Sequence, residues 1–286
     1  MMIDLDEMFY KNYPADFHIY LVTILKNILD NKNHFQALLK GVEGINEDDV
    51  KKTLKIQIRA MYYQSVETLF ELIFAIERIL KNKNQRQGLW YTLSNSPYKQ
   101  NYDRISRKEF AFLDEKYVIE DVQKNRLEVS LAHYIFFFNF ELNKEVLESI
   151  KAINLALRIF ARDFSDRDEY NAFKHSMRVF PTLKAVKLTP RNHVFPKQIL
   201  EMKESVSYLK MMDKDSPKTK LISKSLDINR DYNLALLSSR MISNIIGSRR
   251  SVKFKQPEFI YFFTDQEIKD LSKPSDNLST IHLNFE

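Results

Sequence analysis

The chain has 286 residues, with 44 Lys and Arg against 38 Asp and Glu, no cysteine and only four glycines. The missing cysteines exclude a disulfide framework, a thiolate nucleophile and a cysteine-ligated metal. The few glycines leave no Gly-rich turn of the kind that cradles phosphate in dinucleotide-binding and P-loop enzymes. At 44% hydrophobic and 29% charged residues, the chain should nevertheless fold around a buried core.

The charge is unevenly distributed along the sequence. Residues 1–50 hold nine acidic and four basic side chains, so the remaining 236 residues carry a net charge of +11. The window 171–200 contains six Lys and Arg and no acid. Such clustering is typical of surfaces that contact nucleic acid, and an ordinary solvated surface is the alternative interpretation.

No targeting or membrane signal is evident. Residues 1–13 carry three acids and lack the basic start and apolar core of a signal peptide. The most apolar runs, 69–76 and 134–140, fall far short of the roughly 20 residues that span a bilayer. We therefore expect a cytoplasmic protein without membrane contact, which is consistent with the absence of cysteine.

Helical periodicity covers most of the N-terminal half. Apolar residues at helical spacing predict a helix over 16–30 and a short one over 35–39. The strongest pattern predicts one long helix over 46–81, because Asn46 is a good N-cap and three acids follow it. Two or three further helices are expected between residues 103 and 142.

Two helices are expected on either side of Ser165. The apolar pattern predicts a helix over 143–164. Ser165 is a typical N-cap residue and Asp168 stands where a capping-box acid belongs, which predicts a new helix continuing to Phe180. Pro181 would end it.

Over residues 181–226 the helical pattern is interrupted by prolines. Two runs, 205–212 and 219–226, flank a turn-like sequence and predict an antiparallel hairpin. A last long helix is predicted over 229–246, with Gly247 as the residue that ends it.

The predicted fold is all-α or nearly so: a helical bundle with a small β-hairpin insertion. We expect three parts. They are an acidic N-terminal helical appendage over 1–45, the bundle over 46–271 with its β insertion at about 181–226, and a polar tail over 272–286.

The segment 167–178 holds the residues with the greatest chemical interest. On a helix, one side would gather Arg167, Asn171, Lys174, His175 and Arg178, opposite an apolar stripe. Like charges at this spacing cost about a few tenths of a kcal/mol per pair, which a polyanion would relieve. An imidazole beside guanidinium groups also suits metal-independent cleavage of RNA. The alternative is ordinary polar contacts near a helix C-terminus, where the helix dipole favours cations.

The Asn-x-x-x-His pattern formed by Asn171 and His175 in a late helix of a bundle resembles the HEPN superfamily. Its members include metal-independent ribonucleases of toxin–antitoxin, abortive-infection and CRISPR systems, and also non-catalytic forms. The family motif is an Arg followed by a polar residue and then, after a gap of four to six residues, His. Here Tyr170 stands at the Arg position. Either Arg167 or Arg178 supplies the missing cation, or the site is inactive.

The resemblance implies that His175 acts as general acid and base and that Asn171 supports it. It also implies a homodimer and a role in stress or phage defence. In this interpretation Arg167 and Arg178 complete the catalytic site, while RNA phosphate is held by Lys174, Arg178, Lys184 and Lys187. The alternative function is a non-catalytic module that binds a protein partner.

No metal or cofactor is expected. The other five histidines lie far apart, and no pair has metal-ligand spacing. The predicted partner is therefore RNA or a protein, and the predicted chemistry depends on side chains alone.

Overall fold

The computed structural model describes residues 4–40, 44, 46–82, 88–120, 126–138, 140–174, 179–181, 185–188, 198–201, 205–211, 219–274 and 280–285. The chain divides into two compact units, each built from three segments. The first unit comprises Met1–Val22, Met61–Ser165 and Asn233–Lys273, and the second comprises Thr23–Ala60, Asp166–Tyr232 and Pro274–Glu286.

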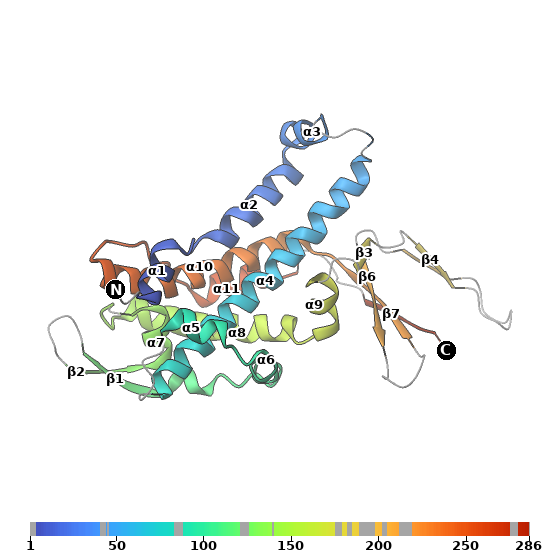
Figure 1. Ribbon diagram of the computed structural model, residues 1–286. Helices are drawn as coiled ribbons and strands as arrows, with labels where there is room; N and C mark the ends of the chain where they lie inside the picture. The colour runs from blue at the N-terminus through green and yellow to red at the C-terminus, as the bar shows by residue number, and fades with distance from the viewer. Residues whose placement is uncertain are drawn as a thin grey trace. The chain divides into compact units, whose positions relative to one another are not determined.

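Most helices lie wholly in the first unit (Figure 1). They are α1 (Leu5–Asn12), α5 (Leu89–Ser94), α6 (Tyr98–Ser106), the 3-10 helix η1 (Ala111–Asp114), α7 (Leu131–Phe136), α8 (Lys144–Phe164) and α11 (Asp265–Ser272). Three helices have residues in both units: α2 (Phe17–Asp30), α4 (Glu47–Lys81) and α10 (Ile228–Phe254). The second unit also holds α3 (Lys32–Lys40) and α9 (Arg167–Lys174).

The predicted fold class is confirmed, as are the helices expected over 16–30, 46–81 and 143–164. Helix α8 shows why periodicity was a good guide there. Asn143 caps it by accepting a hydrogen bond from the Val146 N–H at 2.9 Å, and its inner face, with Ile153 and Phe160, is fully buried.

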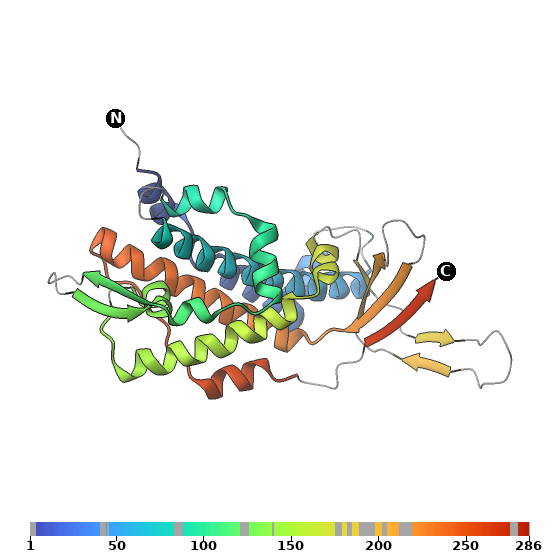
Figure 2. The same cartoon turned by 90° about the horizontal axis from the view of Figure 1, so that it is seen from below.

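A four-stranded antiparallel sheet forms part of the second unit, with strand order β3-β6-β7-β8. Its strands are β3 (Val179–Pro181), β6 (Ser205–Met211), β7 (Thr219–Ser225) and β8 (Thr280–Phe285). A separate pair joins β4 (Ala185–Leu188) to β5 (Gln198–Glu201). The predicted hairpin is confirmed: β6 pairs with β7, and Tyr208 lies opposite Ile222. Figure 2 shows β8 extending this sheet beyond β7.

Two expectations about secondary structure were wrong, and one strand stands where no element was predicted. Strand β8 occupies part of the predicted polar tail, because its backbone pairs with β7. A hairpin of β1 (Lys116–Glu120) and β2 (Arg126–Ser130) stands where only helices were expected. Phe180 belongs to β3, where it pairs with Ser207 of β6, and not to a helix.

Helix α10 also differs from the prediction, because it continues through Gly247 to Phe254. Seven further residues remain helical because the turn after Gly247 is anchored to other elements. Arg249 donates to the carbonyl of Ile135 at 2.8 Å, and Arg250 donates to the carbonyls of Tyr10 and Tyr13. Tertiary contacts therefore outweigh the local tendency of a glycine to end the helix.

Within the described residues, no helix is both long enough and apolar enough to cross a membrane. The long helices α4, α8 and α10 all contain charged residues.

Candidate functional site

Helix α9, which carries the segment of interest, begins at an aspartate and not at the predicted serine. The Asp166 carboxylate accepts a hydrogen bond from the Glu169 N–H at 3.2 Å, and its carbonyl accepts from the Tyr170 N–H at 3.0 Å. Asp166 is therefore the N-cap. Ser165 instead follows the last turn of α8, where its hydroxyl donates to the carbonyl of Ala161.

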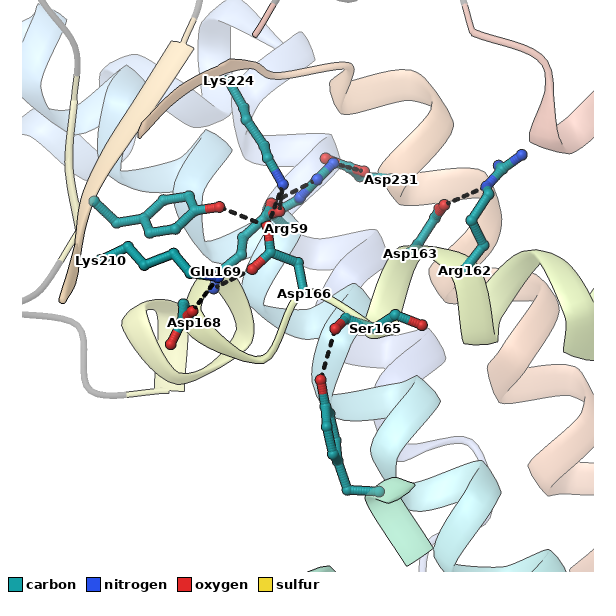
Figure 3. Close-up of polar contacts among 12 residues, drawn as sticks. Arg59, Arg162, Asp163, Ser165, Asp166, Asp168, Glu169, Lys210, Lys224 and Asp231 are labelled. Atoms are coloured by element: carbon teal, nitrogen blue, oxygen red, sulfur yellow. Dashed lines mark hydrogen bonds and ion pairs between the residues drawn. The ribbon is translucent and has the colours of Figure 1, made fainter. Parts of the chain in front are cut away.

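A buried guanidinium group links α9 to two other helices of the second unit (Figure 3). Arg59 of α4 donates to Glu169 Oε1 at 2.8 Å through one terminal nitrogen. Through the other, it donates to Asp231 Oδ1 of α10 at 2.7 Å. One arginine thus holds two carboxylates from separate helices.

A lysine from the sheet completes the arrangement. Lys224 of β7 donates to Asp166 Oδ2 at 2.7 Å and also to Glu169. Tyr208 of β6 donates its hydroxyl proton to the same Asp166 oxygen at 2.7 Å. We call Arg59, Asp166, Glu169, Lys224 and Asp231 the charge cluster.

The charge cluster is largely shielded from water. The side chains of Asp231 and Glu169 are 0% and 2% exposed, and that of Arg59 is 11% exposed. Removing one partner from a buried pair leaves an uncompensated charge and typically costs about 3–5 kcal/mol. Each member therefore depends on the others, and α9 is held in place by this interdependence.

The pKa values of Asp166 and Asp231, two acids of the charge cluster, are shifted in opposite directions. Burial would raise the pKa of Asp166, but the hydrogen bonds from Lys224 and Tyr208 outweigh it and lower that pKa. At Asp231 burial dominates over the attraction of Arg59 and Arg230 and raises the pKa to about 6. Asp231 Oδ2 is buried and accepts no hydrogen bond within the described part of the chain. Asp231 is therefore the member whose charge is least well compensated.

The structure places only some of the predicted site residues. His175, Arg178 and Lys184 lie outside the described residues, and Arg167 is described only by its place in α9. Lys187 lies in β4 opposite Ile199.

The two remaining residues are on α9. Asn171 is half-buried, and Lys174 is exposed with its Nζ 5.4 Å from the centre of the Tyr170 ring. Tyr170 itself is only 6% exposed, so the position at which the HEPN motif has arginine carries a buried aromatic side chain.

The acids near the start of α9 all have cationic partners from other elements. Asp166 and Glu169 pair with Lys224, and Asp168 pairs with Lys210 of β6 at 2.7 Å. Glu169 lies on the same helix as Asn171 and Lys174. It is turned inward, however, and its charge is taken up by Arg59 and Lys224.

Sequence reasoning missed the charge cluster because its members are far apart in the chain. Arg59 is 110 residues from Glu169 and 172 residues from Asp231. The available signal is the run of acids at the start of α9, of which the capping pattern accounts for Asp168 only.

A group of basic residues near the end of α10 has a structural role. Arg249 and Arg250 donate to backbone carbonyls, and Lys253 pairs with Asp4 at 2.9 Å. These cations anchor α1 and α7 within the first unit. The acidic N-terminus thus neutralises one basic residue of this group directly.

Across the described ranges, no group of three or more His, Asp or Glu stands where it could hold a metal ion. The charge cluster contains as many as three carboxylates, but each of them binds a cationic side chain. Its chemistry is that of ion pairing, which positions α9.

The fold and the charge cluster define a mostly helical protein in which a short helix is fixed by buried ion pairs. No family model, curated protein or solved structure matches the chain.

Proposed function

We propose that this protein binds RNA through the segment 167–178 and cleaves it without a metal ion, in the manner of HEPN-like ribonucleases. The observation that supports the proposal is the pairing of the acids of α9. Asp166, Asp168 and Glu169 each interact with a cation from another element. These pairs take up the negative charge at the start of α9, and the sequence over 171–200 holds six Lys and Arg and no acid, which favours an anionic ligand.

In this proposal His175 transfers protons, Asn171 orients it, and the phosphate is held by Arg167, Lys174, Arg178, Lys184 and Lys187. The protein acts in the cytoplasm as a homodimer, as the resemblance implies, and its role is in stress or phage defence. The charge cluster contributes by fixing the helix that carries Asn171.

A second candidate is a non-catalytic module that binds a protein partner. Buried Tyr170 favours it, because this side chain occupies the arginine position of the HEPN motif. Such a protein would keep the fold while lacking the cation that stabilises charge on the phosphate.

The decisive experiment compares His175→Ala with the wild type on total RNA in the presence of EDTA. We expect the wild type to degrade RNA and the variant to lose at least about two orders of magnitude in rate, as is typical when a general acid or base is removed. His34→Ala is the matched control, because His34 is exposed on α3.

Equal RNA integrity with wild type and His175→Ala would contradict the catalytic proposal. RNA binding without cleavage would then leave a binding protein, and no binding at all would favour the module for a protein partner.

A further inference from the structure

Helix α8 presents a row of cations to solvent. The row consists of the exposed residues Lys144, Lys151, Arg158 and Arg162. An α-helix turns by about 100° per residue, so successive spacings of seven, seven and four residues keep all four within about 40° of one another. With a rise of about 1.5 Å per residue, the row is about 27 Å long.

The direction in which this row faces is fixed by packing. Ile153, about 180° around the helix from Lys144, is fully buried, and so is Phe160. Ser149 accepts a hydrogen bond from the Phe263 N–H at 2.9 Å, just before α11, which packs against α8. Helix α8 therefore cannot rotate its basic row inward without losing its core contacts.

The two central cations of the row have no acidic partner among the residues that the structure describes. Neither Lys151 nor Arg158 forms an ion pair there. Lys144 pairs with Glu148 at 3.7 Å, with side chains that are 90% and 56% exposed. Exposed pairs of this kind contribute little to stability, so they can be exchanged for another anion at little cost.

Arg162, at the end of the row, contacts Asp163 at 3.2 Å. Asp163 also accepts a hydrogen bond from the Tyr62 hydroxyl at 3.0 Å, so its charge is shared with a buried group of α4. The side chain of Arg162 remains 61% exposed. The row therefore keeps its excess of positive charge at its centre, at Lys151 and Arg158, while the cations at its two ends each lie beside one acid.

We infer that the basic row on α8 is a docking surface for the phosphate backbone of RNA. This inference rests on the RNA-binding part of the proposed function but uses residues outside the segment 167–178. Neighbouring cations such as Lys151 and Arg158 are about 10.5 Å apart along the helix axis, which is more than the screening length of about 8 Å at physiological salt. A polymer with regularly repeated negative charges can contact all four together, which a single small anion cannot.

RNA fits the row better than a membrane does. A helix that lies on a membrane turns an apolar face toward the lipid. The apolar face of α8 is instead buried in the first unit, with Leu157 fully covered. Both aromatic residues of α8, Phe160 and Phe164, are buried, so the row offers no surface for base stacking and contacts phosphate without selecting sequence.

The test measures binding of an unstructured RNA oligonucleotide by fluorescence anisotropy at several salt concentrations. The variant is Lys151→Gln with Arg158→Gln, and both substitutions lie on an exposed helix face. Each phosphate contact in a single strand contributes about 0.7 to the slope of log K against log salt, so the variant should lose about 1.4. When the salt concentration rises from about 50 to 200 mM, the affinity of both proteins should fall, and the fold-decrease for the variant should be about seven times smaller than that for the wild type.

The matched control is Lys11→Gln with Lys32→Gln, which removes the same charge from exposed positions on α1 and α3. It should retain the wild-type slope. Circular dichroism and thermal melting of all three proteins show whether the variants are folded.

An unchanged slope in the Lys151→Gln, Arg158→Gln variant, or an equal change in the control, would overturn the assignment. So would binding to vesicles containing phosphatidylserine in preference to RNA, or no RNA binding by the wild type. If the wild type cleaves RNA in a manner that depends on His175 but the Lys151→Gln, Arg158→Gln variant keeps the wild-type slope, only the docking role of the basic row is refuted. A reduced slope without any cleavage would support the row and refute the catalytic proposal.

Discussion

At the scale of single residues, the most consequential side chain is Asp231, which shares Arg59 with Glu169. It is fully buried and has a raised pKa, while the charged groups facing it are Arg59, Arg230 and Glu169. In the unfolded chain its pKa is near 3.8, and in the folded protein it is about 6. Between these values the folded state binds a proton that the unfolded state has lost, so stability falls as the pH rises.

We predict that Asp231→Asn removes this dependence. The difference obtained by subtracting the free energy of unfolding of the wild type from that of the variant should rise between pH 3.8 and about 6 and then level off, because only the wild type loses stability over this range. Urea denaturation at a series of pH values measures this difference. The opposite effect of Asp166, whose pKa is lowered, is common to both proteins and cancels.

The control for this prediction is Asp168→Asn. Asp168 forms an exposed pair with Lys210, so its removal tests the loss of an acid outside the buried group. A difference curve for Asp231→Asn that stays flat across this pH range would show that Asp231 is not protonated there in the folded protein.

At the scale of elements, α10 contains an interior glycine that contributes nothing to ending the helix. A Cβ added at Gly247 would lie 3.5 Å from Glu258 Cβ and 3.6 Å from the Phe259 carbonyl oxygen, which is ordinary contact. Glycine in a helix interior costs about 0.5–1 kcal/mol relative to alanine. We therefore predict that Gly247→Ala raises the free energy of unfolding by about this amount, as measured by urea denaturation.

Gly247→Val provides the contrast. Its extra methyl groups exceed the available space beside Glu258 and the Phe259 carbonyl, so it should destabilise the protein. If Gly247→Ala also lowered the free energy of unfolding, the backbone of α10 at Gly247 would have to lie closer to Glu258 and Phe259 than an added Cβ allows.

The elements also show how far sequence patterns reach. The helices predicted over 16–30, 46–81 and 143–164 and the β6–β7 hairpin have a local cause, in apolar spacing and capping residues such as Asn143, and they were correct. Strand β8 depends on pairing with β7, which lies far away in sequence, and α10 continues past Gly247 because of Arg249 and Arg250. No local pattern contains such information. The charge cluster stayed hidden for the same reason.

At the scale of the whole molecule, the proposed chemistry requires no bound metal. We predict that EDTA leaves the thermal melting temperature unchanged, because the carboxylates of the charge cluster already bind Arg59 and Lys224. Differential scanning fluorimetry with and without EDTA measures this. A lower melting temperature in EDTA that is restored by zinc or magnesium would show that a metal contributes to the folded state.

Helix α9 also has a consequence for the order of folding. It has eight residues, whereas isolated helices shorter than about 12–15 residues are marginal in water. Its stability therefore depends on Asp166 and Glu169 reaching Lys224 and Arg59, which come from distant parts of the chain. Tyr208 and Lys224, which both donate to Asp166, lie on β6 and β7, so this part of the arrangement needs both strands in place. We therefore expect the helix that carries Asn171 to become ordered late in the folding of its unit, so that a partly folded chain would not yet present it to a ligand.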